Sequence, residues 1–585
     1  MTTRRTLFAA ALLLMGAALW TSCQKEADSV RDEAPADIPE GSLWLSLEAS
    51  KAADTKALAL DGSTLNAYWE AGEKVEVFLD GGHIGTLTAT PNGTDNTKAT
   101  LSGTVSDASG IAENAVLTLL FPRETWSYAS QAGTLDAIAA NYDYAAAEVE
   151  VVSVDGTNVT TTRASFVNRQ SIYKFTFTGL LAGIASVTIH SAGNKLVASS
   201  AVGGSQTYGD ITVTLDDAAR SANGDGVVYA ALRFDALEAG QTEELTITVT
   251  DTDTESNTYV FTKTSPSGGF INGKYYTSTM RRIRLDDITE TDGKGQLYVA
   301  AQDGDIITGD FMYEGYITVA KDAAVTLHDA NTTPPSGCDH AAIHCLGSAH
   351  IILKGNNQMD AQDDSDYPAI LAAHNDTGSG EEYTLTISGD GKLNADGIGG
   401  GYGIPCGNIV IAGGDIWAEG KNFAAGIGSG YNSSCGTITI SGGQVSATGG
   451  EYAAGIGSGQ RGSCGNILIS GGIIGNSLLN GAIGGKYAAG IGSGQMGSCG
   501  NITITEDIDY LIAQKNNRAI QSRVCIIGYG RDGSCGTVTI AGSEMTDSQM
   551  KIGVADPIGK LFSFAENTPN SQYSYYWVLS KTPFN

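Results

Sequence analysis

A repeat in the C-terminal half of the chain constrains the fold more than any other feature. An aromatic residue followed by Ala-Ala-Gly-Ile-Gly-Ser-Gly occurs three times, at Phe423–Gly430, Tyr452–Gly459 and Tyr487–Gly494. Each copy is followed by Ser-Cys-Gly and then by a short apolar run. The cysteines of these copies and of one degenerate copy on each side are 29, 29, 35 and 36 residues apart. A repeat of this length predicts units that stack on one another, because one unit cannot bury its apolar side alone.

The order of short runs within a unit predicts how the units stack. One unit holds three extended runs, for example 424–428, 437–440 and 444–448, which glycine-rich corners join. Stacking each run on its equivalent in the next unit satisfies the backbone, and parallel crossovers favour the right hand. We therefore predict a right-handed parallel β-helix over residues 295–544. Side chains alternate along a strand, so one set of isoleucines should point inward: Ile409, Ile411, Ile438, Ile440, Ile467, Ile469, Ile502 and Ile504.

The segment before the repeats has the pattern of short strands separated by turns. Runs such as Leu43–Leu47 and Tyr173–Phe177 alternate apolar with polar residues, and turn-forming residues separate them. This pattern is typical of antiparallel β-sandwiches. We predict an all-β chain with sandwiches over 42–150 and 151–285, followed by the β-helix and by a cap over residues 545–585, which covers the open end of the helix.

The first residues predict export and a lipid anchor. Two arginines precede an apolar stretch, 7–20, which is too short to span a bilayer and is typical of a signal peptide over residues 1–22. The next residues resemble a bacterial lipobox, which implies that Cys23 is lipidated; ordinary secretory cleavage is the alternative. Residues 23–41 are charged and predict a flexible tether, whose first residues resemble those of surface lipoproteins of Bacteroidetes. We expect a location on the outer membrane, exposed on the cell surface.

One motif in the first predicted sandwich carries a family resemblance. The segment Trp69–Phe78 resembles the W-x-x-G-D-x-I-x-V-F signature of the fimbrillin-like proteins of Bacteroidetes, with Glu73 in place of the usual Asp. Leu119–Pro122 and Phe270–Tyr276 also fit that family's pattern, so the resemblance covers residues 42–284. It implies two transthyretin-like β-sandwich domains in a surface lipoprotein associated with fimbriae. Family pilins polymerise by donating a C-terminal strand, whereas a third block follows here, which favours a fimbrial tip, an accessory subunit or a free-standing surface protein.

The negative charge of the chain excludes one class of partner. A formal net charge of -30 repels phosphate backbones, so we expect no nucleic-acid partner. The expected partners are a glycan or a host or bacterial surface, other fimbrial subunits, and the outer membrane through the lipid anchor. The Gly-rich block also resembles β-helix regions of bacterial surface proteins, some of which bind carbohydrate.

Aromatic residues that point outward are the candidates for carbohydrate binding, because an aromatic face packs against the apolar face of a sugar. Trp417 alternates with two inward residues on the third run of its unit and should face solvent. Tyr402, Tyr431 and Tyr529 lie in corner loops beside the repeats. The repeat aromatics Phe423, Tyr452 and Tyr487 share the parity of buried alanines and predict a stack in the core or at its edge.

Two segments contain potential metal ligands. Asp360, Asp363, Asp364 and Asp366 form an acidic loop whose oxygens suit Ca²⁺, although such loops are more often only solvated. Cys338, His340 and His344 share one face of a strand, so a three-ligand site can be drawn, but a solvent-facing histidine pair is the favoured interpretation. We expect no other cofactor.

The periodic cysteines leave three alternatives open. Equivalent residues of neighbouring turns are about 4.8 Å apart, within reach of a disulfide, but stacked side chains point in parallel. A ladder of free, packed thiols is the favoured interpretation, and disulfides between neighbours or bound metal are the others.

Three functions fit these patterns. The first is a non-catalytic surface protein that presents the β-helix for carbohydrate or surface binding. The second is a polysaccharide lyase or hydrolase, which needs carboxylates or a base converging on one groove. The third is a structural spacer. Between residues 397 and 505 the charged residues show no paired constellation, which favours a non-enzymatic protein: Asp415, Glu419, Lys421, Glu451, Arg461 and Lys486.

Overall fold

The computed structural model describes residues 35–552 and 575–580, apart from 36, 52–58, 62–63, 67, 94, 107–109, 123–124, 202–205, 225, 255, 363–364, 376–381, 476–480 and 516–522. In these residues there are 52 strands but only three α-helices, α1 (Leu135–Asn141), α2 (Asp217–Asn223) and α3 (Asp547–Ile552). The prediction of an all-β chain is confirmed. No helix in the described ranges has the length and apolar character needed to cross a membrane. The predicted signal peptide, Cys23 and most of the predicted tether lie outside the described residues.

The first unit is a single eight-stranded sheet that closes on itself through β1, which pairs with β6 on one side and with β11 and β12 on the other. Alternate residues of β1 are buried because every second side chain points into the ring of strands. Leu45, Leu87 and Trp69 lie in this core. Its strands are β1 (Ser42–Lys51), β4 (Lys74–Leu79), β5 (Gly82–Asn92), β6 (Asp95–Ser106), β7 (Val116–Phe121), β10 (Ala145–Asp155), β11 (Asn158–Thr161) and β12 (Ala164–Asn168).

The boundary between the first two units differs from the predicted seam near residue 150. Strand β10 runs through that position without a break, and β11 and β12 extend the first sheet to Asn168. Conversely β8 (Thr125–Ser127) and β9 (Ser130–Gln131) pair with strands of the second unit. Apolar and polar residues alternate in the same way on both sides of residue 150. The sequence therefore did not indicate that β11 and β12 belong to the first unit and β8 and β9 to the second.

The second unit has two main sheets that share one hydrophobic core. Phe261 and Val249 come from one sheet, and Phe175, Val228 and Met280 from the other. The first sheet has the order β20 (Thr258–Thr264), β19 (Glu244–Asp251), β14 (Ile184–Ser191), β17 (Ile211–Thr214) and β9. In the second, β13 (Ser171–Thr178) lies between β18 (Val227–Leu232) and β21 (Tyr275–Arg284). A small sheet joins β8 to β15 (Val197–Ala201) and β16 (Thr207–Tyr208).

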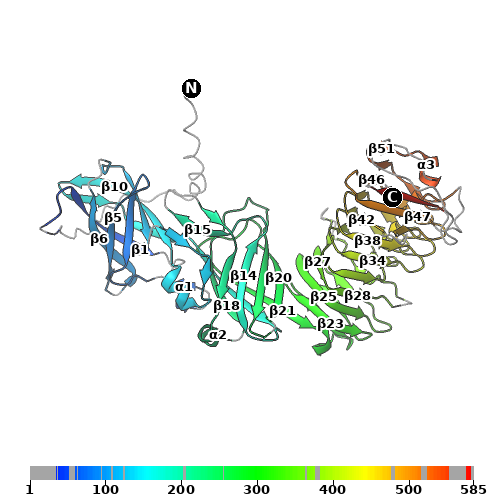
Figure 1. Ribbon diagram of the computed structural model, residues 1–585, viewed down its shortest axis with the longest axis horizontal. Coiled ribbons are helices and arrows are strands. Elements are labelled where there is room, and N and C mark those ends of the chain that lie inside the picture. Colours follow the sequence, from blue (N-terminus) through cyan, green and yellow to red (C-terminus); the bar gives the residue numbers. More distant parts are fainter. Residues whose placement is uncertain are drawn as a thin grey trace, which may run out of the picture.

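A strand near the start of the repeat region pairs with an edge strand of the second unit (Figure 1). The end of β21, Arg282–Arg284, pairs in parallel with Ile306–Thr308 of β23 (Ile306–Met312). Beside this pairing, the Arg281 guanidinium donates from Nε to Asp305 Oδ1 over 3.0 Å and from Nη2 to Oδ2. The Asp305 carboxylate is almost fully buried and also accepts from the Gln302 backbone N–H over 2.7 Å. Strand pairing and a buried ion pair therefore join the second unit to the repeats.

The repeats stack as turns of one coil, and we call residues 297–544 the coil. The turns follow one another along one axis (Figure 1), and most of their strands belong to three parallel ladders. The first ladder holds the Gly-Ile-Gly segments: β22 (Leu297–Ala301), β24 (Gly315–Val319), β26 (Ile343–Cys345), β29 (Ile370–Leu371), β32 (Ile398–Gly399), β35 (Ile427–Gly428), β39 (Ile456–Gly457), β44 (Ile491–Gly492) and β48 (Ile527–Gly528).

The other two ladders complete each turn. The second contains β23, β25 (Ala323–Thr333), β27 (Ala349–Lys354), β30 (Thr384–Gly389), β33 (Asn408–Ile411), β37 (Ile438–Ile440), β41 (Ile467–Ile469), β46 (Ile502–Ile504) and β50 (Val538–Ile540). The third contains β28 (Asn356–Met359), β31 (Lys392–Ala395), β34 (Asp415–Glu419), β38 (Gln444–Thr448), β42 (Ile473–Ile474), β43 (Ala482–Ile483) and β47 (Tyr510–Lys515). All strand pairs between these neighbouring turns are parallel.

The inward isoleucines form one continuous core. Ile409 pairs with Ile438, which pairs with Ile467, and this pairs with Ile502; all four have no exposed surface. The neighbouring isoleucines at 411, 440, 469 and 504 are equally buried. The predicted stacking of the repeats and the predicted inward face are confirmed.

The C-terminal end of the coil is covered by short elements. Strand β51 (Ser543–Glu544) pairs with β50, and β52 (Tyr575–Ser580) pairs antiparallel with β47. Helix α3 begins three residues after β51. Both α3 and β52 lie within the predicted cap, 545–585; residues 553–574 and 581–585 lie outside the described residues.

Candidate functional site

Two tyrosines stack on one corner of the coil. Ile398 of β32 pairs with Ile427 of β35, and Tyr402 and Tyr431 each follow four residues later, so they occupy equivalent positions in consecutive turns. Their ring centroids are 4.7 Å apart at an interplanar angle of 21°. Gly403 (φ 65°) and Asn432 (φ 48°) follow them in the left-handed conformation that tight turns use. The two rings are aligned because the tyrosines occupy equivalent positions and are followed by the same kind of tight turn.

A second aromatic column runs beside the first. Phe423, Tyr452 and Tyr487 stack with centroid distances of 5.4 and 5.1 Å, which confirms the predicted stack. Phe423 also meets Tyr431 edge-on at 5.6 Å, so the two columns touch. Phe423 is 38% exposed and forms the solvent-facing end of its column.

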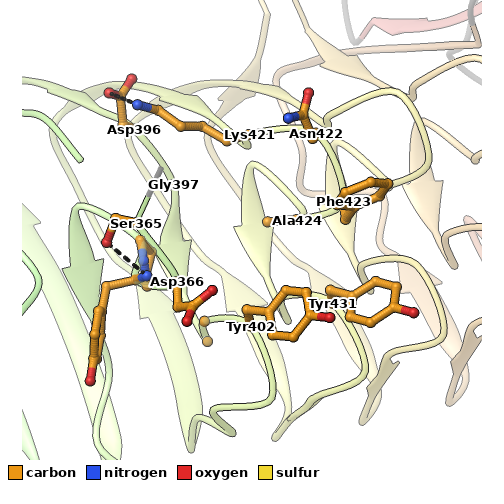
Figure 2. Close-up of a pocket in the computed structure, with 14 residues that line it drawn as sticks. Ser365, Asp366, Asp396, Gly397, Tyr402, Lys421, Asn422, Phe423, Ala424 and Tyr431 are labelled. Carbon is orange, nitrogen blue, oxygen red and sulfur yellow. Dashed lines mark hydrogen bonds and ion pairs between the residues drawn. The ribbon is translucent and has the colours of Figure 1, made fainter. Parts of the chain in front are cut away.

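Tyr402, Tyr431 and Phe423 form one wall of a surface hollow of about 110 Å³, which we call the aromatic hollow (Figure 2). It lies at the corner between the third and first ladders, because Asp396 follows β31, Lys421 follows β34 and Tyr402 follows β32. The Lys421 ammonium lies 3.3 Å from the Asp396 carboxylate and donates to the Ala361 carbonyl over 2.7 Å. Figure 2 shows this ion pair on the side opposite Tyr402 and Tyr431, with Asp366 beside Tyr402.

The hollow combines an aromatic wall with polar groups of both kinds. Tyr402 is 53% exposed, so a flat apolar surface is open to solvent. Asp366 and Asp396 supply hydrogen-bond acceptors, and Asn422 supplies both a donor and an acceptor. The volume is below that of pockets that enclose small molecules, so a ligand would lie over the hollow. An exposed aromatic face rimmed by carboxylate and amide groups is suited to the apolar faces and hydroxyls of sugars.

The structure brings together two of the four predicted carbohydrate-binding residues. Tyr402 and Tyr431 line the hollow, whereas Trp417 and Tyr529 do not. Trp417 is 45% exposed, as predicted, but lies on the third ladder between Asn394 and Ser446 of the adjacent turns. Tyr529 follows Gly528 directly, so it aligns with a serine of the other turns and not with Tyr431.

The Tyr529 side chain is used inside the protein. Its hydroxyl donates to Asp547 of α3, and the Lys551 ammonium lies 5.4 Å from the ring centroid. This packing against the C-terminal helix places Tyr529 apart from the aromatic hollow.

Two of the four predicted calcium ligands lie in the part of the chain that the structure describes. Asp363 and Asp364 lie outside the described residues. Asp360 accepts from Gln358 over 2.9 Å and from Thr333 over 3.3 Å, while Asp366 lines the aromatic hollow. Within the described ranges no group of three or more His, Cys, Asp or Glu residues is placed to hold a metal ion.

The histidines of this segment are half-buried. His340 stacks on Tyr316 with centroids 4.2 Å apart, and Cys338 Sγ donates to Gln296 Oε1 over 3.1 Å. Burial lowers the pKa of His340 and of His344, since desolvation disfavours the charged ring. The predicted histidine pair is thus only partly exposed to solvent.

The repeat cysteines form a ladder of free thiols. Cys435, Cys464, Cys499 and Cys535 pair in register in short bridges β36 (Ser434–Cys435), β40 (Ser463–Cys464), β45 (Ser498–Cys499) and β49 (Ser534–Cys535). None of the eight cysteines in the described ranges forms a disulfide. A hydrogen bond with Cys406, together with burial, raises the pKa of Cys435. This agrees with the favoured interpretation of packed thiols.

Two buried thiols outside the ladder, Cys345 and Cys525, should be unreactive in the native protein. Burial raises the pKa of Cys525 to about 11 and that of Cys345 to about 12, and the thiolate is the reactive form. At pH 8, labelling of these two thiols by a disulfide reagent should be about a hundredfold or more slower than in urea-unfolded protein, since two pKa units lower the thiolate fraction by that factor. Unfolded protein should release eight thiols besides Cys23. A lower count would indicate disulfides and contradict the free ladder.

The polar side chains of the aromatic hollow were not predicted from the sequence to take part in carbohydrate binding. Asp366 was predicted only as a calcium ligand, and Asp396 was not singled out, because both precede the regular repeats. The signal that could have found Lys421 and Asn422 is their position directly before Phe423 at the start of a repeat.

The fold and the hollow together define an all-β protein whose coil of stacked strands carries an aromatic and polar surface site. No protein-family model matches the chain, and no curated protein matches it. Among solved structures it is similar to a putative cell adhesion protein from Bacteroides uniformis, with 17% identity, 42% of this chain and 94% of that chain covered, and a TM-score of 0.26. It is also similar to a fimbrial assembly protein from Parabacteroides distasonis (14% identity, 41% and 91% covered, TM-score 0.23). A third similar structure is the tip fimbrial protein Mfa3 from Porphyromonas gingivalis, with 9% identity, 40% of this chain and 84% of that chain covered, and a TM-score of 0.21.

Proposed function

We propose that this chain is a non-catalytic surface lipoprotein that binds carbohydrate through the aromatic hollow. The observation that carries the proposal is the exposed Tyr402 face beside Tyr431, Asp366 and Asp396. Such a surface offers contacts to both the apolar and the hydroxyl-bearing sides of a sugar ring.

The remaining parts of the chain fit a role in display. In this proposal Cys23 carries the lipid and 23–41 form the tether, so that the protein is anchored in the outer membrane and faces outward. The first two units are the two transthyretin-like domains of a fimbrillin-like protein, and the coil is a right-handed parallel β-helix. The protein acts as a fimbrial tip, an accessory subunit or a free-standing adhesin. The motif of Trp69–Phe78 and the stacked repeats support this assignment.

A second function is favoured by one specific observation. Asp366, Asp396 and Lys421 line the same hollow, and a polysaccharide lyase or hydrolase needs carboxylates or a base at one groove. The Lys421–Asp396 ion pair and the Ala361 carbonyl hold the ammonium in a structural position, which favours binding without cleavage.

The test is electrophoresis of the protein in gels that contain plant or host polysaccharides. Retardation without product release supports the adhesin, and new reducing ends or unsaturated products support the enzyme. Tyr402→Ala should weaken binding about tenfold, since loss of a stacking face costs about 1.4 kcal/mol.

Tyr313→Ala is the matched control, because Tyr313 is 67% exposed on the coil and lies outside the hollow. Equal binding by the wild type and by Tyr402→Ala would contradict the proposed site. If no polysaccharide retards the protein, the spacer function replaces the adhesin.

A further inference from the structure

A second hollow lies next to the residues that follow the tyrosine pair. It has a volume of about 370 Å³ and is lined by Gly403, Pro405, Asn432, Ser433, Ser434, Arg461 and Ser463. Gly403 directly follows Tyr402 and Asn432 directly follows Tyr431, so this hollow and the aromatic hollow involve adjacent residues of the same two corners. We call this second space the arginine hollow. A volume of this size is sufficient for one sugar unit.

The two hollows differ in charge. The arginine hollow has one guanidinium, three serines and an amide in its lining, and no acidic side chain. The aromatic hollow has the carboxylates Asp366 and Asp396, and its cation Lys421 is already paired. Arg461 is exposed and forms no ion pair in the part of the chain that the structure describes. A free guanidinium among hydroxyl and amide groups is suited to a carboxylate, which it can bind through two hydrogen bonds.

The arginine is specific to one turn of the coil. The equivalent positions in the other turns hold Gly403, Asn432, Met496 and Asp532, each with a positive φ. Arg461 has a φ of 54°, in the left-handed region that favours glycine or asparagine. A cationic side chain therefore stands at this corner only in the turn that follows Tyr431, whereas the one other charged residue at this corner, Asp532, is acidic.

We propose that the two hollows form one site for an acidic oligosaccharide. A uronic acid unit lies in the arginine hollow with its carboxylate on Arg461, and its neutral neighbour lies against Tyr402 in the aromatic hollow. This inference rests on the proposed glycan-binding function and names its substrate class. The net charge of -30 does not prevent it, because charges farther than about 8 Å are screened at physiological ionic strength.

The test compares two probes that differ only in charge. Calorimetry would measure binding of a tetrasaccharide of alternating glucuronic acid and N-acetylglucosamine, and of the same tetrasaccharide with its carboxyl groups reduced to alcohols. The wild type should bind the acidic probe at least about tenfold more tightly, because a charge-assisted bidentate contact is lost on reduction. Arg461→Ala should bind both probes equally, at the affinity of the wild type for the reduced probe.

Met496→Ala is the control, since Met496 occupies the equivalent corner of the next turn and is 48% exposed. It should keep the preference of the wild type for the acidic probe. Equal binding of both probes by the wild type, or a preference that survives in Arg461→Ala, would overturn the acidic subsite and leave the aromatic hollow standing. Binding of neutral polysaccharides alone would do the same. Loss of all glycan binding in the gel panel would overturn the subsite together with the proposed function.

Discussion

Replacing Gly457 by alanine should lower the free energy of unfolding by more than about 4 kcal/mol. Gly457 has a φ of 136°, and a Cβ at this position would lie 2.8 Å from the carbonyl carbon of Gly492 and still closer to its oxygen. That oxygen cannot move away freely, because it accepts a hydrogen bond from the Ser458 N–H over 2.9 Å. The turns would have to separate, and the isoleucine core on both sides would lose its contacts.

The measurement is urea unfolding followed by far-ultraviolet circular dichroism. Gly337→Ala is the control, since Gly337 also has a positive φ, 77°, but a Cβ there meets nothing within 4 Å. The control should lose only about 1–2 kcal/mol, the strain of a left-handed alanine. Similar losses in the two variants would show that the Gly-Ile-Gly segments do not stack backbone on backbone.

Replacing Arg281 by methionine should destabilise the junction between the second unit and the coil by about 3–5 kcal/mol. The substitution removes the guanidinium that binds both oxygens of Asp305, whose side chain is only 1% exposed. The Asp305 carboxylate would remain buried with the Gln302 N–H as its neighbour, and an uncompensated buried charge is costly. The junction would then depend on the short pairing of Arg282–Arg284 with β23, without the buried ion pair.

Calorimetric unfolding checks this expectation, because a weakened junction should split the transition of the second unit from that of the coil. Arg284→Met is the matched control: its guanidinium lies 3.6 Å from Asp286 and 3.7 Å from Asp287, and all three side chains are substantially exposed. It should change stability by no more than about 1 kcal/mol. An unchanged transition in Arg281→Met would mean that strand pairing alone holds the junction.

The candidate site could be predicted only in part. Tyr402 and Tyr431 were identified because they lie in corner loops beside the repeats, but their equivalent positions in consecutive turns and their stacking were seen only in the structure. Trp417 was correctly predicted to be exposed, but exposure does not tell which other side chains surround it. Asp366 and Asp396 come from turns whose spacing is irregular, so their place beside Tyr402 could not be derived from a period.

The repeat spacing in the sequence was sufficient to predict the stacking of the repeats, the inward isoleucines and the columns of cysteines and aromatic rings. Equal spacing repeats the same local environment, so each unit predicts the next. Three features could be seen only once the chain was folded: the extent of the first sheet to Asn168, the pairing of β21 with β23, and the position of two hollows at neighbouring residues of the same corners. These contacts join segments with no common period, and they depend on how distant surfaces pack.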